Sequence, residues 1–179
     1  MTSLYRKRRE LFAPTPEGEA RLLLLIHAFS SKPEGVEGRL KLAKLDFLLR
    51  YPDFFNRAMA KRVPGKALPN LESGAVPTVE ESMIRYRFGP WDPAHFALIG
   101  RLVSRGLVVP VHNKHGIGLR TTDRARAIVE NLSQSPEWSD DAKRATLLNE
   151  HFDLAGQTLM KFLYKTFPEI LETPMGGKL

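Results

Sequence analysis

The chain has 179 residues, of which 42% are hydrophobic and 26% charged, the ordinary composition of a globular protein large enough for one domain with a hydrophobic core. It has no cysteine, so disulfides, thiol chemistry and cysteine-ligated zinc are excluded. No apolar run is long enough for a membrane span and no signal-peptide pattern occurs, which predicts a cytoplasmic protein.

The net charge of +7 comes mainly from two segments. Residues 101–126 hold six basic side chains and one acidic side chain. The N-terminal segment adds a basic cluster formed by Arg6, Lys7, Arg8 and Arg9. This excess predicts an acidic partner, either nucleic acid or an acidic protein surface, although exposed basic residues can also serve only solubility.

The first part of the chain is predicted to be helical. Pro16, after a threonine cap, begins one helix. Residues 39–51 carry two apolar stripes, one of them starting at Leu40, which is typical of a helix between two layers. Pro52 ends that helix and a short helix follows it. Residues 63–79, rich in proline and glycine, are interpreted as a loop inserted within one domain.

Strand and helix patterns then alternate. Residues 83–88 alternate as in a strand with one buried face, and Gly89 and Pro90 are predicted to turn the chain. Asp92 and Pro93 begin a helix that Gly106 ends. The predicted buried side chains are Ile84, Tyr86 and Phe88 of the strand and Phe96, Ile99, Leu102 and Val103 of the helix.

A hairpin and another helix follow. Residues 107–111 and 117–121 read as strands, and Asp123 is predicted to cap the helix. The inward stripe predicted for that helix is Ala125, Ile128, Val129 and Leu132. This order is typical of a winged helix-turn-helix, with residues 93–105 as the recognition helix and 112–118 as the wing.

Two further helices are predicted near the C-terminus, the last of them with Leu159, Leu163 and Phe167 at helical spacing. The predicted fold class is α+β, mainly α: a winged helix-turn-helix-like core with additional N-terminal and C-terminal helices. We expect a single domain, 1–179, with a helical and winged-helix core at 15–132 and a C-terminal helical extension at 135–171.

The sequence carries no catalytic signature. Neither a phosphate-binding glycine loop nor a dinucleotide fingerprint occurs. His112 and His115 fall across the predicted hairpin turn with no third ligand, and His27 and His95 are expected to be structural. The pair Asp140-Asp141 suits the start of a helix. No enzyme activity, metal site or cofactor is therefore predicted.

A basic surface for DNA is one hypothesis. The candidate residues are Arg101, Arg105, Lys114, Arg120 and Arg124, together with the N-terminal cluster. The predicted recognition helix has no Asn or Gln to read adenine, and its arginines lie in its second half, which favours contact with the phosphate backbone over sequence reading. The same fold also serves as a protein-docking module.

Four blocks carry a resemblance to a known family: GRLKLAKLDFLLRYPDFF, ESMIRYRFGPWDPAHFALIGRLVSRGLV, GLRTTDRARAIV and TLMKFLYKTFPEI. The stretches RYRFGPWD and FLYKTFPE are its specific parts. The chain resembles, over residues 20–171, the middle component of ABC-three component systems, and especially the accessory subunit of Lamassu-type anti-phage defence complexes. Ala125 departs from a glycine that is often found at this position in winged helices.

The resemblance implies a non-catalytic subunit that binds an SMC/Rad50-like ATPase and helps to hold an effector subunit, a nuclease, inactive until foreign DNA is sensed. Partner-binding candidates are the aromatic residues Trp91, Phe162, Tyr164 and Phe167, although those of the last helix can equally cover the core.

The alternative is a free-standing winged-helix transcription regulator that binds DNA as a homodimer. Such regulators need a long dimerisation helix, whereas the C-terminal segments here are short and interrupted at Gly156. An accessory subunit should bind DNA weakly, without sequence preference and with strong salt dependence. Replacing Arg101 and Arg105 with Glu is predicted to reduce DNA binding by the complex with the fold intact.

Overall fold

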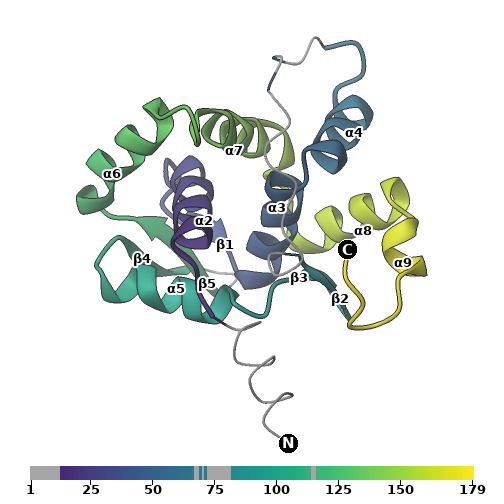
Figure 1. Ribbon diagram of the computed structural model, residues 1–179, viewed down its shortest axis with the longest axis horizontal. Helices are drawn as coiled ribbons and strands as arrows, with labels where there is room; N and C mark the ends of the chain where they lie inside the picture. Colours follow the sequence, from purple (N-terminus) through teal and green to yellow (C-terminus); the bar gives the residue numbers. More distant parts are fainter. Residues whose placement is uncertain (1–12, 67–68, 70, 72–81, 114–115) are drawn as a thin grey trace, which may run out of the picture.

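Helix α3 (Arg39–Arg50) lies at the centre of the molecule, and every residue from Lys41 to Arg50 is buried (Figure 1). It packs against α2, α4, α7 and α8, and its N-terminal end lies against the strand β1. The prediction of a helix between two layers, made from its two apolar stripes, is confirmed. The exception is Leu40, which begins one stripe but is 42% exposed.

The structure is a computed structural model that describes residues 13–66, 69, 71, 82–113 and 116–179. It is of the α+β class and mainly helical. The other elements, in chain order, are α2 (Pro16–Ala28), β1 (Val36–Glu37), α4 (Pro52–Arg62), β2 (Ile84–Tyr86), β3 (Gly89–Trp91), α5 (His95–Ser104), β4 (Val108–Asn113), β5 (Gly116–Thr121), α6 (Asp123–Gln134), α7 (Ser139–Phe152), α8 (Gly156–Thr166) and α9 (Glu169–Glu172).

The C-terminal helices complete the same hydrophobic core as the N-terminal ones. Helix α7 packs along α2 and α3, and α8 packs against α3 and α4. Leu159, Leu163 and Phe167 are fully buried, as their spacing predicts, and the Phe167 ring contacts Phe47 and Phe54. Residues 135–171 are therefore continuous with the core. Within the described residues, no helix combines the length and apolar character that a bilayer span requires.

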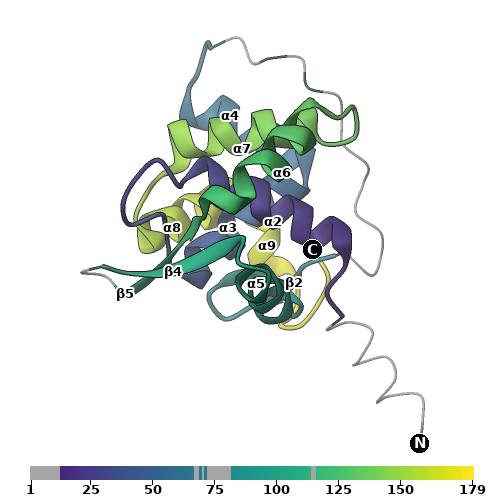
Figure 2. The same cartoon turned by 90° about the vertical axis from the view of Figure 1, so that its left-hand side faces the viewer.

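A small antiparallel sheet covers one side of α2. Its strand order is β1-β5-β4, and the β4–β5 hairpin projects from the body of the molecule, as Figure 2 shows. Gly35 precedes β1 with a φ of 60°, and a Cβ there would collide with the carbonyl of Leu119, so only glycine fits. The predicted strands at 107–111 and 117–121 are confirmed.

The segment 83–91 differs from its prediction. It forms two short strands, β2 and β3, joined by a turn at Arg87 and Phe88, so Gly89 and Pro90 belong to a strand and not to the turn. Met83 is fully buried, whereas Tyr86 and Phe88 are more than 40% exposed, so the predicted burial of these two rings is wrong. Ile84, also predicted to be buried, is half-buried. The C-terminal segment pairs with this strand through backbone bonds with Met83 and Arg85, a contact that the local sequence pattern does not indicate.

Helix α5 also turns a different side inward. His95, Leu98 and Leu102 are buried, while Phe96 and Val103 are 58% and 37% exposed. The predicted stripe was therefore right only at Leu102 and partly at Ile99, which is half-buried. Gly106 ends the helix with a φ of 67°, as predicted. In α6, Thr122 and not Asp123 occupies the cap position, and Ile128 is 41% exposed because the helix packs inward through Ala125 and Val129.

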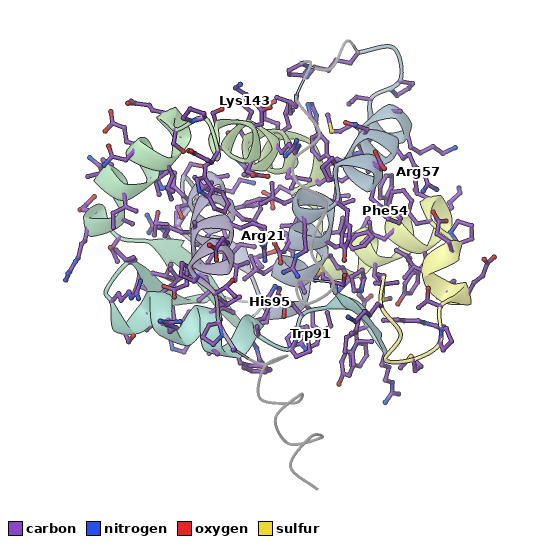
Figure 3. The ribbon with its side chains drawn as sticks, in the orientation of Figure 1. Arg21, Phe54, Arg57, Trp91, His95 and Lys143 are labelled. Atoms are coloured by element: carbon purple, nitrogen blue, oxygen red, sulfur yellow. The ribbon has the colours of Figure 1, made fainter. Side chains whose placement is uncertain are left out.

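A buried ion-pair network, centred on the fully buried Asp46, connects α2, α3 and α5. Its Oδ1 accepts a bond of 2.7 Å from Arg21 Nε of α2, and its Oδ2 lies 2.6 Å from Arg50 Nη2 and 2.9 Å from His95 Nε2. Arg50 also binds Asp92, 2.7 Å away, just before α5. Figure 3 shows Arg21 and His95 in the space between α2 and α3.

Burial acts to raise the pKa of Asp46, but the positive charges of Arg21 and Arg50 and the bond to His95 outweigh it and hold the pKa well below its usual range. The carboxylate therefore stays ionised wherever the protein is folded near neutral pH. It fixes the rotation of α5 about its axis, because His95 must face Asp46, and Phe96 and Val103 then face outward.

Replacing Asp46 with Asn is expected to lower the free energy of unfolding by about 3–5 kcal/mol, because it removes the carboxylate that two buried guanidinium groups share. Urea denaturation followed by circular dichroism measures the loss. The matched control is Asp123→Asn, which breaks an exposed pair with Arg126 and should change stability little. Equal effects of the two substitutions would contradict the central place of Asp46.

Candidate docking surface

Exposed apolar side chains gather on one side of the molecule. Of the ten large hydrophobic side chains that are exposed among the described residues, six line adjoining hollows around the start of α3. These six, called the apolar face below, are Leu40, Tyr86, Phe88, Phe96, Val103 and Ile117. Since scattered exposed hydrophobic residues are normal but a contiguous group is not, this face is a candidate interaction site.

Four elements build the apolar face. Leu40 of α3 lies in the middle and lines all three hollows. The β2–β3 hairpin contributes two aromatic rings whose centroids lie 6.0 Å apart, those of Tyr86 and Phe88. Helix α5 contributes its outward side, and Ile117 comes from the projecting hairpin. Segments far apart in the sequence thus meet in one surface.

Trp91 ties the apolar face to the buried ion-pair network. The ring is half-buried, 5.5 Å from His95 and 5.7 Å from Phe96 between centroids, and it lines the same hollow as Tyr86. Figure 3 shows Trp91 next to His95, toward the edge of the molecule. Of the aromatic residues predicted to bind a partner, Trp91 is the one that borders this face.

The other three aromatic candidates lie elsewhere. Phe167 is fully buried, so the prediction that its ring docks on a partner is wrong; it fills the core instead. Phe162 is half-buried against Phe152, with centroids 5.4 Å apart. Tyr164 is half-buried, and its hydroxyl lies beside Gly89. Phe167 continues the helical spacing of Leu159 and Leu163, which explains its place in the core.

The charges around the apolar face are mostly positive. The Arg39 guanidinium lies over the Phe96 ring, 4.3 Å from its centroid, and that of Arg87 lies 5.5 Å from the centroid of Phe88. Glu37 is the one carboxylate among the described residues that line the three hollows, and it lies 3.7 Å from the Lys41 ammonium.

Lys44, one turn beyond Leu40, lines the hollow between Phe88 and α8 and is 3% exposed. Its Nζ donates to the Leu40 carbonyl at 3.0 Å. Burial lowers the pKa of this lysine from its ordinary 10.5 to about 8. Lys44 belongs to neither apolar stripe of this helix, so its burial was not predicted from the sequence.

Arg101 of α5 and Arg105, which caps the end of α5, do not line the hollows of the apolar face. Arg101 Nε and Arg105 Nη1 reach back to the buried carboxylate of Glu19 in α2, at 3.1 and 2.8 Å. Arg101 also donates to the Pro14 carbonyl. Changing both arginines to Glu would place like charges beside a buried Glu19, so we now expect this substitution to destabilise the packing of α5 on α2.

The remaining basic candidates have no ion pair with Glu19 among the described residues. Arg120 is half-buried and Arg124 is exposed, with its side chain beside Gly106. Lys114, Arg6, Lys7, Arg8 and Arg9 lie outside the described residues. Among the predicted DNA-binding residues that the structure describes, Arg124 is exposed and takes no part in the ion pairs that join α5 to α2.

Asp46, Asp92 and His95 place three ligand atoms within 4.8 Å of one another, a spacing that also suits a metal ion. The carboxylate oxygens, however, already accept bonds from Arg21 and Arg50. A cation there would face two buried guanidinium groups, so this cluster is suited to joining helices and not to holding a metal.

Comparison with known proteins found no relative. The chain matches no family model, no curated protein and no solved structure.

The lowered pKa of Lys44 predicts a pH dependence of stability. Between the folded pKa of about 8 and the ordinary value of 10.5, the unfolded chain binds more protons, so the free energy of unfolding should rise with pH across this window, by at most about 3 kcal/mol. Below pH 8 the cost of burying the cation is fully present.

Urea denaturation at pH 7, 9 and 10 measures this rise. The variant Lys44→Met should be more stable than the natural chain at pH 7 and should lack this part of the rise. An identical pH dependence in both proteins would contradict the burial of the Lys44 charge.

Proposed function

We propose that this protein is a cytoplasmic, non-catalytic accessory subunit that docks through its apolar face onto an SMC-like ATPase in an anti-phage defence complex. The observation that carries the proposal is the outward side of α5, where Phe96 and Val103 are exposed and join exposed side chains from three other elements. The resemblance to the middle component of ABC-three component systems supports the choice of partner.

The proposal includes a winged helix-turn-helix core made of α2, β1, α3, α5, β4 and β5. The strand order β1-β5-β4 and the projecting hairpin after α5 support it. In this interpretation α4 and the β2–β3 hairpin are an insertion between the second and third helices of the motif, and α5 takes the position of the recognition helix.

The composition of α5 favours protein docking over DNA reading. A recognition helix places polar side chains against base edges in the major groove. Here the outward side of α5 is apolar, and Arg101 and Arg105 are engaged with Glu19. The same observation weighs against the alternative of a free-standing transcription regulator.

Contact with DNA remains a secondary part of the proposal. Arg124 and the N-terminal basic cluster would meet DNA held by the ATPase through phosphate contacts without sequence preference. The effector subunit, expected to be a nuclease, would be held by the same assembly.

Co-purification tests the docking proposal. The tagged protein, expressed with the products of its neighbouring genes, is expected to retain a large coiled-coil ATPase. Phe96→Glu and Ile117→Glu, which place charges in the apolar face, should abolish this recovery. The control is Ile128→Glu on α6, a residue of comparable exposure away from this face. Recovery unaffected by the first two substitutions, or loss in all three, would contradict docking through the apolar face.

The DNA contribution is tested on the assembled complex with Arg124→Glu. Loss of one phosphate contact should weaken binding about equally for unrelated sequences and reduce the slope of log K against log salt by about 1. Fluorescence anisotropy with two unrelated duplexes measures both effects. An unchanged slope would place Arg124 among residues that serve only solubility.

A further inference from the structure

A buried ammonium group beside the apolar face lacks a counter-charge. The Lys44 side chain is 3% exposed, and its Nζ donates one bond, to the Leu40 carbonyl at 3.0 Å. An ammonium group offers three donors. No carboxylate of the described residues forms an ion pair with it, whereas the neighbouring Lys41 pairs with Asp153 at 2.6 Å. A buried charge without a partner is costly, and a site that keeps one is suited to receiving an anion.

The hollow in which Lys44 lies connects directly with the apolar face. Phe88 and Ile117 of that face line it, together with Met160 of α8. Arg39 and Arg87 lie above Phe96 and Phe88 on the same side of the molecule. Glu37 also lines this hollow, 3.7 Å from the Lys41 ammonium. An occupant of this surface therefore meets apolar side chains, a rim on which positive charges outnumber this one carboxylate, and one positive charge at depth.

The secondary structure around the hollow favours a helix as the occupant. Addition of a strand needs a free sheet edge with backbone N–H donors. β5 lies between β1 and β4 and has no free edge, and β3 and β4 carry Pro90 and Pro110, which lack this donor. An amphipathic helix satisfies its own backbone and presents only side chains.

We propose that an amphipathic helix of a partner protein docks on the apolar face and places an Asp or Glu, set within its own apolar side, against the Lys44 ammonium. This inference deepens the proposed function, on which it rests for the location of the interface, and it specifies the chemistry of the partner. The low pKa of Lys44 in the free protein fits this interpretation, because a carboxylate partner would restore the charged form.

Nucleic acid fits the same surface less well. A phosphate could pair with Lys44, but the sugar and base groups beside it would have to lie against six exposed side chains that are mainly apolar. The test below therefore distinguishes DNA binding at Lys44 from binding of a helix.

The test selects helical peptides, displayed on phage with randomised surface positions, against the full-length protein. Peptides recovered on the natural chain should share large apolar residues at helical spacing and one Asp or Glu at a fixed position among them. Replacing that acid with Asn or Gln should weaken binding about tenfold or more to the natural chain and little to Lys44→Met. The control Lys61→Met removes an exposed lysine of α4 and should behave as the natural chain does.

Three results would overturn the inference: no enriched peptides, enriched peptides without a fixed acid, or an acid whose contribution is the same in Lys44→Met. Displacement of the peptide by a short duplex DNA, lost in Lys44→Met but not in Lys61→Met, would assign the site to nucleic acid instead. The outcomes are separable from those of the proposed function, because the peptides need no ATPase. If the peptides bind in an acid-dependent way but co-purification recovers no ATPase, this inference is supported and the ATPase is excluded as the partner.

Discussion

Much of the structure depends on one buried carboxylate. Asp46 has no exposure to solvent, yet it stays ionised because Arg21 and Arg50 reach it from two helices and His95 from a third. Such a group is expensive to bury and must keep all its partners at once. Helices α2, α3 and α5 are therefore held in one arrangement. Hydrophobic contacts alone would not define it, since α5 is apolar on nearly every side.

That arrangement places apolar side chains on the outward side of α5 as well as on its buried side. Its polar groups point inward or sideways, with His95 toward Asp46 and Arg101 toward Glu19, while Phe96 faces outward. The apolar face results directly from this. Lys44 belongs to the same region, a cation held beneath exposed hydrophobic side chains. In the isolated chain, the apolar face is exposed to water and the Lys44 ammonium has no carboxylate partner among the described residues. A partner helix would cover the first with apolar side chains and pair with the second through a carboxylate.

The sequence correctly predicted the parts of the fold in which the apolar residues follow a clear period. The two stripes of α3, the β4–β5 hairpin and the spacing of Leu159, Leu163 and Phe167 have only one arrangement that buries them. In contrast, the apolar positions of α5 are compatible with several rotations, and the pairing of His95 with Asp46, which selects one, joins residues 49 positions apart. Met83 and Arg85 likewise bond with the C-terminal segment, a contact that the local sequence pattern does not indicate. The candidate site was missed for this reason, although a helix apolar on all sides could have indicated an exposed apolar surface.

The most direct test of docking through the apolar face is photo-crosslinking from position 96. A photoreactive amino acid is placed there in the protein expressed with its neighbouring genes, and a second protein carries it at position 128, which is similarly exposed on α6. After irradiation, mass spectrometry identifies what is bound to each. Crosslinks from position 96 to a helical segment of a coiled-coil ATPase, with few from position 128, are the predicted result. Crosslinks from position 96 to DNA alone, or to protein equally from both positions, would contradict the account.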